Sequence, residues 1–430
     1  MAKVIRVGLL GCGTVGGGVV RILDREARDI AVRVGGQLLV TRVGVRDLAK
    51  DRQLPLPADA FTDDLLSVVE ADDVDVIVEV MGGRDPAGGL IRRALELGKP
   101  VVTANKELVA HEGPELYELA ESSGVDLMYE AAVAGAIPII RPLKQSLAGD
   151  RVRRVVGILN GTTNYILTKM TEEGASYDAV LSEAQRLGYA EADPTADVGG
   201  HDAASKTAIL ASLAFDSKVH ADDVFREGIE NVTATDISVA DRLGYVIKLL
   251  GIASEVDDQV AVRVHPTFLP KAHPLAAVRE SFNAIYVEAD AAGELMFYGR
   301  GAGALPTGSA VVGDLIDAAR NVQQTTRGPV ESVHRGRSIR PIQELQTQYY
   351  VLLDVDDTAG VLAAVATTFG KNDVSIAQVW QEGQGDRAQL VLITHRALEG
   401  ALRSCVRDLQ GTEGVRNVAS VMRVEAEVFS

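Results

Sequence analysis

Short β-branched runs alternate with amphipathic segments over residues 4–129, and this alternation constrains the fold of the 430-residue chain more than any other feature. The helical patterns between the runs include Leu90–Leu97 and Glu107–Ser123. A strand, a helix and a parallel strand form a right-handed crossover, and successive crossovers cover both faces of a sheet. The sequence therefore predicts a doubly wound α/β domain of the Rossmann type. The predicted strands are Val4–Leu10, Leu38–Val45, Val74–Val80, Val101–Thr103 and Asp126–Tyr129.

A glycine-rich loop follows the first predicted strand directly and opens a helix. Gly11, Gly13 and Gly16 have the spacing Gly-x-Gly-x-x-Gly. This spacing permits a tight turn, lets the backbone approach a pyrophosphate and allows close packing of helix on strand, with the helix N-terminus facing the anion. Because the motif stands at the start of a βαβ series, we expect a dinucleotide site rather than only a tight turn. The expected contacts are Gly11, Gly13, Thr14, Val15 and Gly16.

The end of the second predicted strand carries the residues that select the form of the cofactor. An acidic side chain there binds the ribose 2′-hydroxyl of NAD, whereas a basic one accommodates the 2′-phosphate of NADP. The sequence reads Arg46-Asp47 and continues with Lys50 and Arg52. Arg46 favours NADP, while Asp47 leaves NAD open. A solvated surface turn is the alternative interpretation of this segment.

After about residue 131 the pattern of predicted secondary structure changes to longer helices mixed with strands, which predicts a second, α+β domain. Residues 334–346 are polar and basic around Pro341, as is typical of a linker. We expect boundaries at 1–131, 132–333, 334–346 for the linker and 347–430, with about 301–330 packing back on the nucleotide domain. The expected elements of the second domain include helices at Tyr177–Leu187, Asp202–Phe215 and Ser238–Leu250, and strands at Val260–His265 and Ala284–Ala289.

The last segment of the chain has its own pattern of strand, helix, two strands, helix and strand. This βαββαβ order predicts an antiparallel sheet with helices on one face. The six elements are expected at Tyr349–Asp356, Gly360–Phe369, Val374–Trp380, Ala388–Thr394, Leu398–Gln410 and Val415–Arg423.

Lysines and carboxylates suited to a small ionic substrate gather at two places. Lys106 follows a predicted strand, where parallel sheets bind ligands. Farther along, a group of carboxylates precedes Lys206 in a segment rich in glycine and alanine, and such a cluster suits a substrate that carries an ammonium group. Asp202 and Lys206 are four residues apart and share a helix face, which also fits an ordinary surface ion pair. The carboxylates are Glu191, Asp193, Asp197 and Asp202.

The polar loop Asn160–Asn164 joins a predicted strand to a helix. Backbone amides and hydroxyls at the start of that helix, at Gly161 and Thr162, suit a substrate carboxylate. Ordinary N-capping explains the loop nearly as well.

The composition of the chain limits the class of binding partner and the compartment that we expect. The chain has 43 basic and 60 acidic residues and a net charge of −17, which argues against a nucleic acid or an anionic membrane as main partner. Its two cysteines, Cys12 and Cys405, favour a reduced compartment. Neither an export signal nor an apolar run long enough to span a membrane is expected. A cytoplasmic location and a small-molecule partner are the expectation.

Several of these segments resemble the monofunctional homoserine dehydrogenase family with a C-terminal ACT domain, and the likeness covers essentially the whole chain. The segments follow the family's order. They are Gly8–Gly16, Thr103–Lys106, Tyr129–Pro138, Ile158–Ile166, Gly188–Pro194, Asp197–Lys206 and Gly301–Val312.

The resemblance implies the interconversion of L-aspartate 4-semialdehyde and L-homoserine with an NAD(P) cofactor, in threonine, methionine and isoleucine biosynthesis. It implies Lys206 as proton donor, Lys106 as a second active-site lysine near cofactor and substrate, and Glu191 as a substrate-binding carboxylate. Asp197 and Asp202 would share this polar network. Thr103, Gly301 and Gly303 would contact the cofactor.

The resemblance also implies a loop for a monovalent cation, sodium or potassium. Its ligands would be mainly backbone oxygens, which suit such ions. They are Glu130, Val133, Gly135 and Ile137.

The C-terminal ACT resemblance implies a homodimer or homotetramer and inhibition by threonine. The family's Asp-x-Pro-Gly turn reads Asp357-Thr358-Ala359-Gly360 here, so the proline is missing.

Two alternatives to a homoserine dehydrogenase stay open: a dehydrogenase of another small amino-acid-like substrate, and a non-catalytic sensor of nucleotide and amino acid. Lys206, Lys106, Glu191 and the intact glycine loop weigh against the sensor.

Overall fold

The computed structural model describes residues 3–329, 336–384 and 387–425, and the chain forms two compact units that are each discontinuous in sequence. The first unit comprises Met1–Leu159, Ser205–Val224 and Phe282–Arg337. The second comprises Asn160–Ala204, Phe225–Ser281 and Ser338–Ser430. Each is described by itself below.

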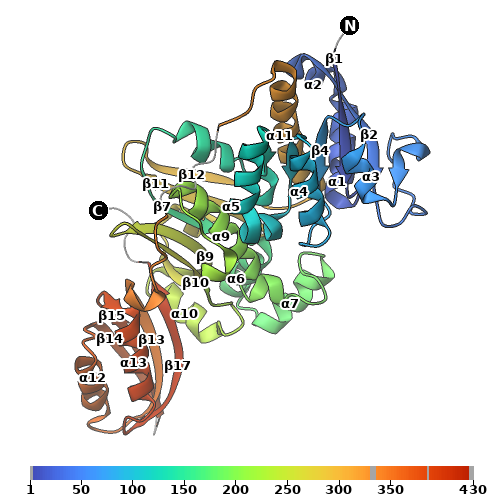
Figure 1. Ribbon diagram of the computed structural model, residues 1–430. Coiled ribbons are helices and arrows are strands. Elements are labelled where there is room, and N and C mark those ends of the chain that lie inside the picture. Colours follow the sequence, from blue (N-terminus) through green and yellow to red (C-terminus); the bar gives the residue numbers. More distant parts are fainter. Residues whose placement is uncertain (1–2, 330–335, 385–386, 426–430) are drawn as a thin grey trace. The chain divides into compact units, whose positions relative to one another are not determined.

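A six-stranded parallel sheet in the order β3-β2-β1-β4-β5-β6 forms the centre of the first unit. Figure 1 labels its strands β1, β2 and β4. The sheet confirms the predicted doubly wound α/β fold, and every predicted strand is present within a few residues. The strands are β1 (Lys3–Leu10), β2 (Gly36–Gly44), β3 (Phe61–Thr62), β4 (Val76–Glu79), β5 (Val101–Thr103) and β6 (Leu127–Met128).

Helices cover both faces of this sheet. In a strand, successive side chains point to opposite faces. Val7 and Leu9 of β1 therefore pack in one core with α1, α2 and α11, whereas a Cβ on Gly8 would lie 2.9 Å from Val68 of α3 on the other face. A Cβ on Gly18 would lie 2.2 Å from the carbonyl oxygen of Ala304, so α1 and α11 approach closely. The helices are α1 (Thr14–Arg25), α2 (Ala27–Val34), α3 (Leu65–Glu70), α4 (Ala87–Glu96), α5 (Lys106–Ser123) and α11 (Ala304–Gln324).

The first unit also contains an antiparallel set of three strands, in which β11 (Phe282–Ala289) pairs with both β7 (Val152–Ile158) and β12 (Gly293–Arg300). Helix α9 (His201–Ala214) begins in the second unit and continues into the first. It is the helix that carries both Asp202 and Lys206, one turn apart.

Two long antiparallel strands, β9 (Tyr245–Val256) and β10 (Gln259–Pro270), organise the second unit. The prediction of one helix over Ser238–Leu250 is wrong: α10 (Ala234–Arg242) ends there, Gly244 turns the chain at φ +83°, and β9 begins at Tyr245. A continuous apolar run fits a buried strand as well as a buried helix, so periodicity alone could not separate them. The other α-helices and strands described before the C-terminal module are α6 (Gly161–Glu173), α7 (Tyr177–Arg186), α8 (Thr195–Val198) and β8 (Phe225–Arg226), which pairs with β10.

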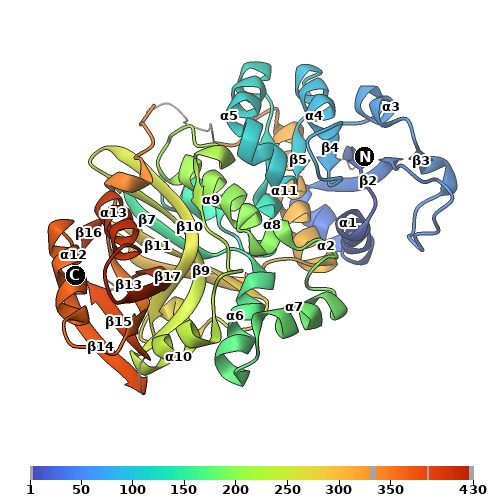
Figure 2. The ribbon, with the colours of Figure 1, turned by 90° about the horizontal axis from the view of Figure 1, so that it is seen from below.

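The C-terminal module, Gln346–Val424, has the predicted βαββαβ order with one additional short strand, β16 (Ala397–Leu398). Helices α12 and α13 lie on one face of its sheet (Figure 2). They pack against alternate residues of β13, such as Val351 and Leu353. Strand β17 pairs with β13 and, in parallel, with β10. The elements are β13 (Gln346–Asp356), α12 (Val361–Lys371), β14 (Ile376–Gln384), β15 (Arg387–Thr394), α13 (Glu399–Leu409) and β17 (Val415–Val424).

Part of the predicted linker lies beside β10. The Ser338 carbonyl accepts from the Val260 amide at 3.0 Å, and the Arg340 amide donates to the Val260 carbonyl at 2.9 Å. Residues 334–335 of the predicted linker and 426–430 of the predicted C-terminal domain lie outside the described residues. Among the described residues, no helix is long and apolar enough to span a lipid bilayer.

Candidate active site

The glycine loop has the geometry that its sequence predicts. Gly11 lies between β1 and α1 at φ +97°, a conformation that favours glycine. A Cβ on Gly16 would lie 2.2 Å from the carbonyl oxygen of Gly11. Both positions therefore require glycine for local reasons, the first for the turn and the second for close packing of the helix on the loop.

Gly13 differs from its neighbours, because a Cβ there would meet no atom within 4 Å. Gly13 is the N-cap of α1, makes no side-chain capping bond, and is followed by a first turn without acidic residues. The N-terminus of α1 thus presents backbone amides and the positive end of the helix dipole toward open space. This arrangement fits the pyrophosphate of a dinucleotide, with Thr14 and Val15 in the first turn.

Arg52, which is not among the predicted site residues, ties the loop after β2 to the glycine loop. Arg52 donates from Nε to the Cys12 carbonyl at 3.2 Å and from Nη2 to the Asp47 carbonyl at 2.8 Å. Arg46 is exposed, and the Asp47 carboxylate accepts from the Ala49 amide at 2.9 Å. The basic run itself was visible in the sequence, but not which member would brace the loop.

A buried carboxylate, Glu79, organises the carboxyl ends of β4 and β5. Its Oε1 accepts from the Met81 amide at 2.7 Å, and its Oε2 accepts from the Thr103 hydroxyl at 2.6 Å. Asn105 caps α5 by accepting from the Leu108 amide at 3.1 Å. The loops before Lys106, the first residue of α5, are therefore braced from inside. Glu79 is not among the predicted site residues, although an acidic residue at the end of an apolar strand marks it in the sequence.

Lys206 lies buried on α9, where its Nζ donates to the Leu159 carbonyl oxygen at 2.7 Å. The same carbonyl accepts from Nδ2 of Asn283 on β11 at 2.9 Å. A Cβ on Gly301 would lie 2.3 Å from the Asn283 side chain, so the absence of a side chain at Gly301 allows the segment before α11 to contact Asn283. Gly303, at φ +128°, then caps α11. Lys206 and the segment at Gly301 are thus brought together through Asn283, another residue missed from the sequence.

In the second unit, Asn160 joins two of the predicted carboxylates. Its Nδ2 donates to Asp197 Oδ1 at 2.7 Å and to Asp202 Oδ2 at 2.9 Å. Its Oδ1 accepts from the Thr163 amide at 2.8 Å and so caps α6. One amide therefore fixes both the helix start and the carboxylates.

Other predicted substrate residues border this group. Gly161 begins α6, and the Thr162 hydroxyl donates to the Tyr189 carbonyl at 2.6 Å. Glu191 is exposed, on the segment that follows α7, and its backbone carbonyl accepts from Gln185 at 3.1 Å. The polar network thus includes Asp197 and Asp202, while the Glu191 side chain faces solvent.

The predicted cation loop is a buried turn with a left-handed pair, Ala134 at φ +53° and Gly135 at φ +56°. The Glu130 carboxylate accepts from the amides of Ile139 and Ile140 at 2.6 and 2.8 Å, so this side chain caps the following turn. Within the described ranges, no three His, Cys, Asp or Glu side chains gather to hold a metal ion.

Comparison with known proteins identifies the family. A family model described as homoserine dehydrogenase matches residues 138–316, and one described as homoserine dehydrogenase, NAD binding domain, matches residues 11–130. The homoserine dehydrogenase of Mycobacterium tuberculosis strain H37Rv is 52% identical over an alignment of 434 positions that covers 98% of each chain. That of Corynebacterium glutamicum is 49% identical, over 98% of this chain and 96% of its own.

Solved structures agree with this result. The homoserine dehydrogenase of Thiobacillus denitrificans has a TM-score of 0.94 and 40% identity over 98% of both chains. A hyperthermophilic archaeal homoserine dehydrogenase in complex with NADPH has a TM-score of 0.62 and 27% identity, over 74% of this chain and 98% of its own. The chain therefore belongs to the homoserine dehydrogenase family of oxidoreductases.

Proposed function

We propose that this chain interconverts L-homoserine and L-aspartate 4-semialdehyde with lysine-assisted proton transfer. The observation that carries the proposal is the buried Lys206 ammonium, held at 2.7 Å by the Leu159 carbonyl and one helical turn from Asp202. When bound, the nicotinamide supplies hydride to the aldehyde carbon. Negative charge develops on the aldehyde oxygen at that moment, and an ammonium there both stabilises the charge and donates the proton. In the oxidative direction the neutral amine takes the proton from the hydroxyl.

The charged groups of the substrate suggest roles for the remaining residues of the candidate site. We propose that Glu191, Asp197 and Asp202 receive the substrate ammonium, because carboxylates pair with it, and that Gly161 and Thr162 at the start of α6 receive its carboxylate. Lys106 would lie near both the cofactor and the substrate. Two lysines near a substrate also need neighbouring carboxylates to offset their charge in a partly buried site.

We propose NADP as the preferred cofactor, contacted by the glycine loop, Arg46, Thr103 and the segment with Gly301 and Gly303. The Thr103 hydroxyl is already engaged with Glu79, so its contact would come from the backbone. A sodium or potassium ion would be held by the backbone carbonyls of the loop from Glu130 through Val133 and Gly135 to Ile137.

Arg46→Ala is expected to weaken NADP binding by about 10- to 150-fold, because one charge-assisted hydrogen bond contributes about 1.5–3 kcal/mol. NAD binding should change little, since NAD has no 2′-phosphate. Titration of both cofactors by fluorescence measures the ratio of the two losses. Arg52→Ala provides the comparison, because loss of the loop brace should weaken both cofactors. Equal losses for NADP and NAD in Arg46→Ala would leave Arg46 as part of the turn only.

We also propose that the C-terminal module is an ACT domain that mediates assembly into a dimer or tetramer and makes the enzyme sensitive to threonine. Threonine should inhibit the full-length enzyme by binding an inactive arrangement more tightly, with a coupling of about 1–3 kcal/mol. Initial rates at several homoserine concentrations, with increasing threonine, measure the effect. Absence of inhibition, or inhibition that homoserine fully overcomes by competition, would contradict regulation through this module.

The test of the proposed activity is a direct assay. Purified protein is incubated with NADP and L-homoserine, and nicotinamide absorbance is followed, with L-serine and L-threonine as alternative hydroxy-amino acids. Homoserine should be oxidised with the highest kcat/KM. A higher kcat/KM for another hydroxy-amino acid would identify a dehydrogenase of a different substrate.

A further inference from the structure

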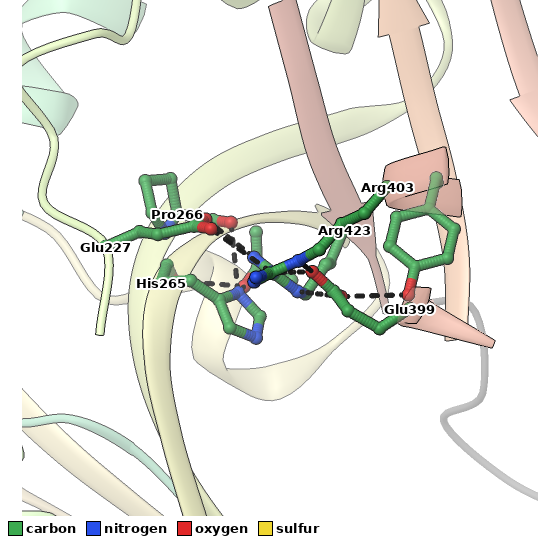
Figure 3. Close-up of polar contacts among 8 residues, drawn as sticks. Glu227, His265, Pro266, Glu399, Arg403 and Arg423 are labelled. Atoms are coloured by element: carbon green, nitrogen blue, oxygen red, sulfur yellow. Dashed lines mark hydrogen bonds and ion pairs between the residues drawn. The ribbon is translucent and has the colours of Figure 1, made fainter. Parts of the chain in front are cut away.

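A buried arginine near the end of β17 joins the C-terminal module to the rest of the second unit (Figure 3). Arg423 is 5% exposed and donates from Nη2 and Nε to the carboxylate of Glu399, at 2.6 and 2.9 Å. Its Nη1 donates to Glu227 Oε2 at 2.6 Å. Burial alone would lower the pKa of Arg423, but the two carboxylates more than offset this and raise it. The arginine therefore remains charged while it holds both carboxylates.

Glu227 lies in a short segment, residues 225–230. Two arginines of the C-terminal module also contact the aromatic ring of Phe225 in this segment. The guanidinium of Arg423 lies 5.0 Å from the centre of the Phe225 ring, and that of Arg403 lies 5.2 Å from it. Cations over an aromatic face are attracted by its electron density. The module thus holds the segment both at Phe225 and at Glu227.

The other end of the segment is packed directly against α8. The Ile229 amide donates to the Val198 carbonyl at 2.9 Å. A Cβ on Gly228 would lie 2.4 Å from that same oxygen, so the two backbones touch. Val198 immediately follows Asp197, whose carboxylate is held by Asn160. The printed contacts between the segment and α8 join backbone to backbone, so we expect a displacement at Glu227 to reach α8.

We propose that Glu227 and Arg423 are positioning residues for the substrate, acting through the segment of residues 225–230 on Asp197. The C-terminal module then sets the affinity for homoserine even when no effector is bound. The inference rests on the proposed function, in which Asp197 contacts the substrate ammonium. It adds a structural role to a module that the family resemblance assigns to regulation.

The test compares homoserine KM, NADP KM and kcat in the full-length enzyme and in Glu227→Gln, which keeps the shape of the side chain and removes its charge. We expect homoserine KM to rise about 3- to 30-fold, the range of coupling through positioning networks, with kcat and NADP KM unchanged. Arg423→Lys keeps the charge but loses the planar fork, and should raise homoserine KM by a smaller factor.

Glu382→Gln is the matched control. Glu382 on β14 pairs with Arg242 on α10, so it joins the C-terminal module to a different element of the unit. Its homoserine KM should equal that of the parent enzyme. An unchanged homoserine KM in Glu227→Gln, equal rises in both KM values, or the same rise in Glu382→Gln would overturn the inference. Failure of the parent enzyme to oxidise homoserine would instead refute the proposed function.

Discussion

Replacing Lys206 with alanine is expected to lower turnover about 10²- to 10⁴-fold, the range for loss of a positioned acid or base. The loss should appear in kcat at saturating homoserine, because Lys206 would act on the oxygen that gains charge as the hydride arrives. The NADP dissociation constant should be nearly unchanged, since the glycine loop and the start of α1 do not involve this side chain. Stopped-flow measurement of the first turnover, together with a cofactor titration, separates the two quantities.

A structural role for Lys206 must be distinguished from a chemical one, because its Nζ also holds the Leu159 carbonyl. Lys206→Arg preserves a donor to that carbonyl but places a group that does not lose its proton, so it should restore thermal stability without restoring turnover. Lys218→Ala removes an exposed lysine that pairs with Glu118 and should change neither property. Near-normal turnover in Lys206→Ala would remove Lys206 from the chemistry.

The glycine loop should give the second large effect. Gly16→Ala forces a Cβ to within 2.2 Å of the Gly11 carbonyl oxygen, and overpacking of this kind costs about 1–3 kcal/mol of stability. Gly13→Ala adds the same methyl group where nothing lies within 4 Å, so its melting temperature should match that of the parent enzyme. If the pyrophosphate occupies that space, Gly13→Ala should weaken cofactor binding about tenfold or more, as expected when one charge-assisted hydrogen bond is lost.

Melting temperature and cofactor affinity, measured together, therefore distinguish two glycines of one motif. Gly16→Ala should lower both, whereas Gly13→Ala should lower the affinity alone. Parent-like NADP affinity in Gly13→Ala would mean that the cofactor does not approach the N-terminus of α1.

Much of the architecture could be predicted because it depends on local patterns. The strand runs of residues 4–129 and the βαββαβ order of the C-terminal module both follow from periodicity and turn residues. The apolar run that begins at Tyr245 overlaps the helix predicted over Ser238–Leu250, because a run without alternation has no period that separates a buried strand from a buried helix. Its strand character comes from pairing with β10, which is a tertiary property.

The residues of the candidate site differ in the same respect, because some have local roles and others depend on partners distant in sequence. Gly11, Gly13 and Gly16 could be predicted because their roles are set by the backbone within one turn. Glu79 ends an apolar strand, which marks it in the sequence, but its partner Thr103 lies 24 residues away. The partner of Asn283 lies 124 residues away, and only the folded sheets bring these residues together. Arg423 is a further case, with Glu227 separated from it by 196 residues.

The most direct test of the central claim follows the hydride itself. Homoserine that carries two deuterium atoms on C4 is incubated with the enzyme and NADP, and the reduced cofactor is isolated and analysed by mass spectrometry and NMR. The account predicts one deuterium on C4 of the nicotinamide ring for each aspartate 4-semialdehyde formed, with the other retained in the aldehyde. Reduced cofactor without deuterium, or release of deuterium to water during aldehyde formation, would contradict it.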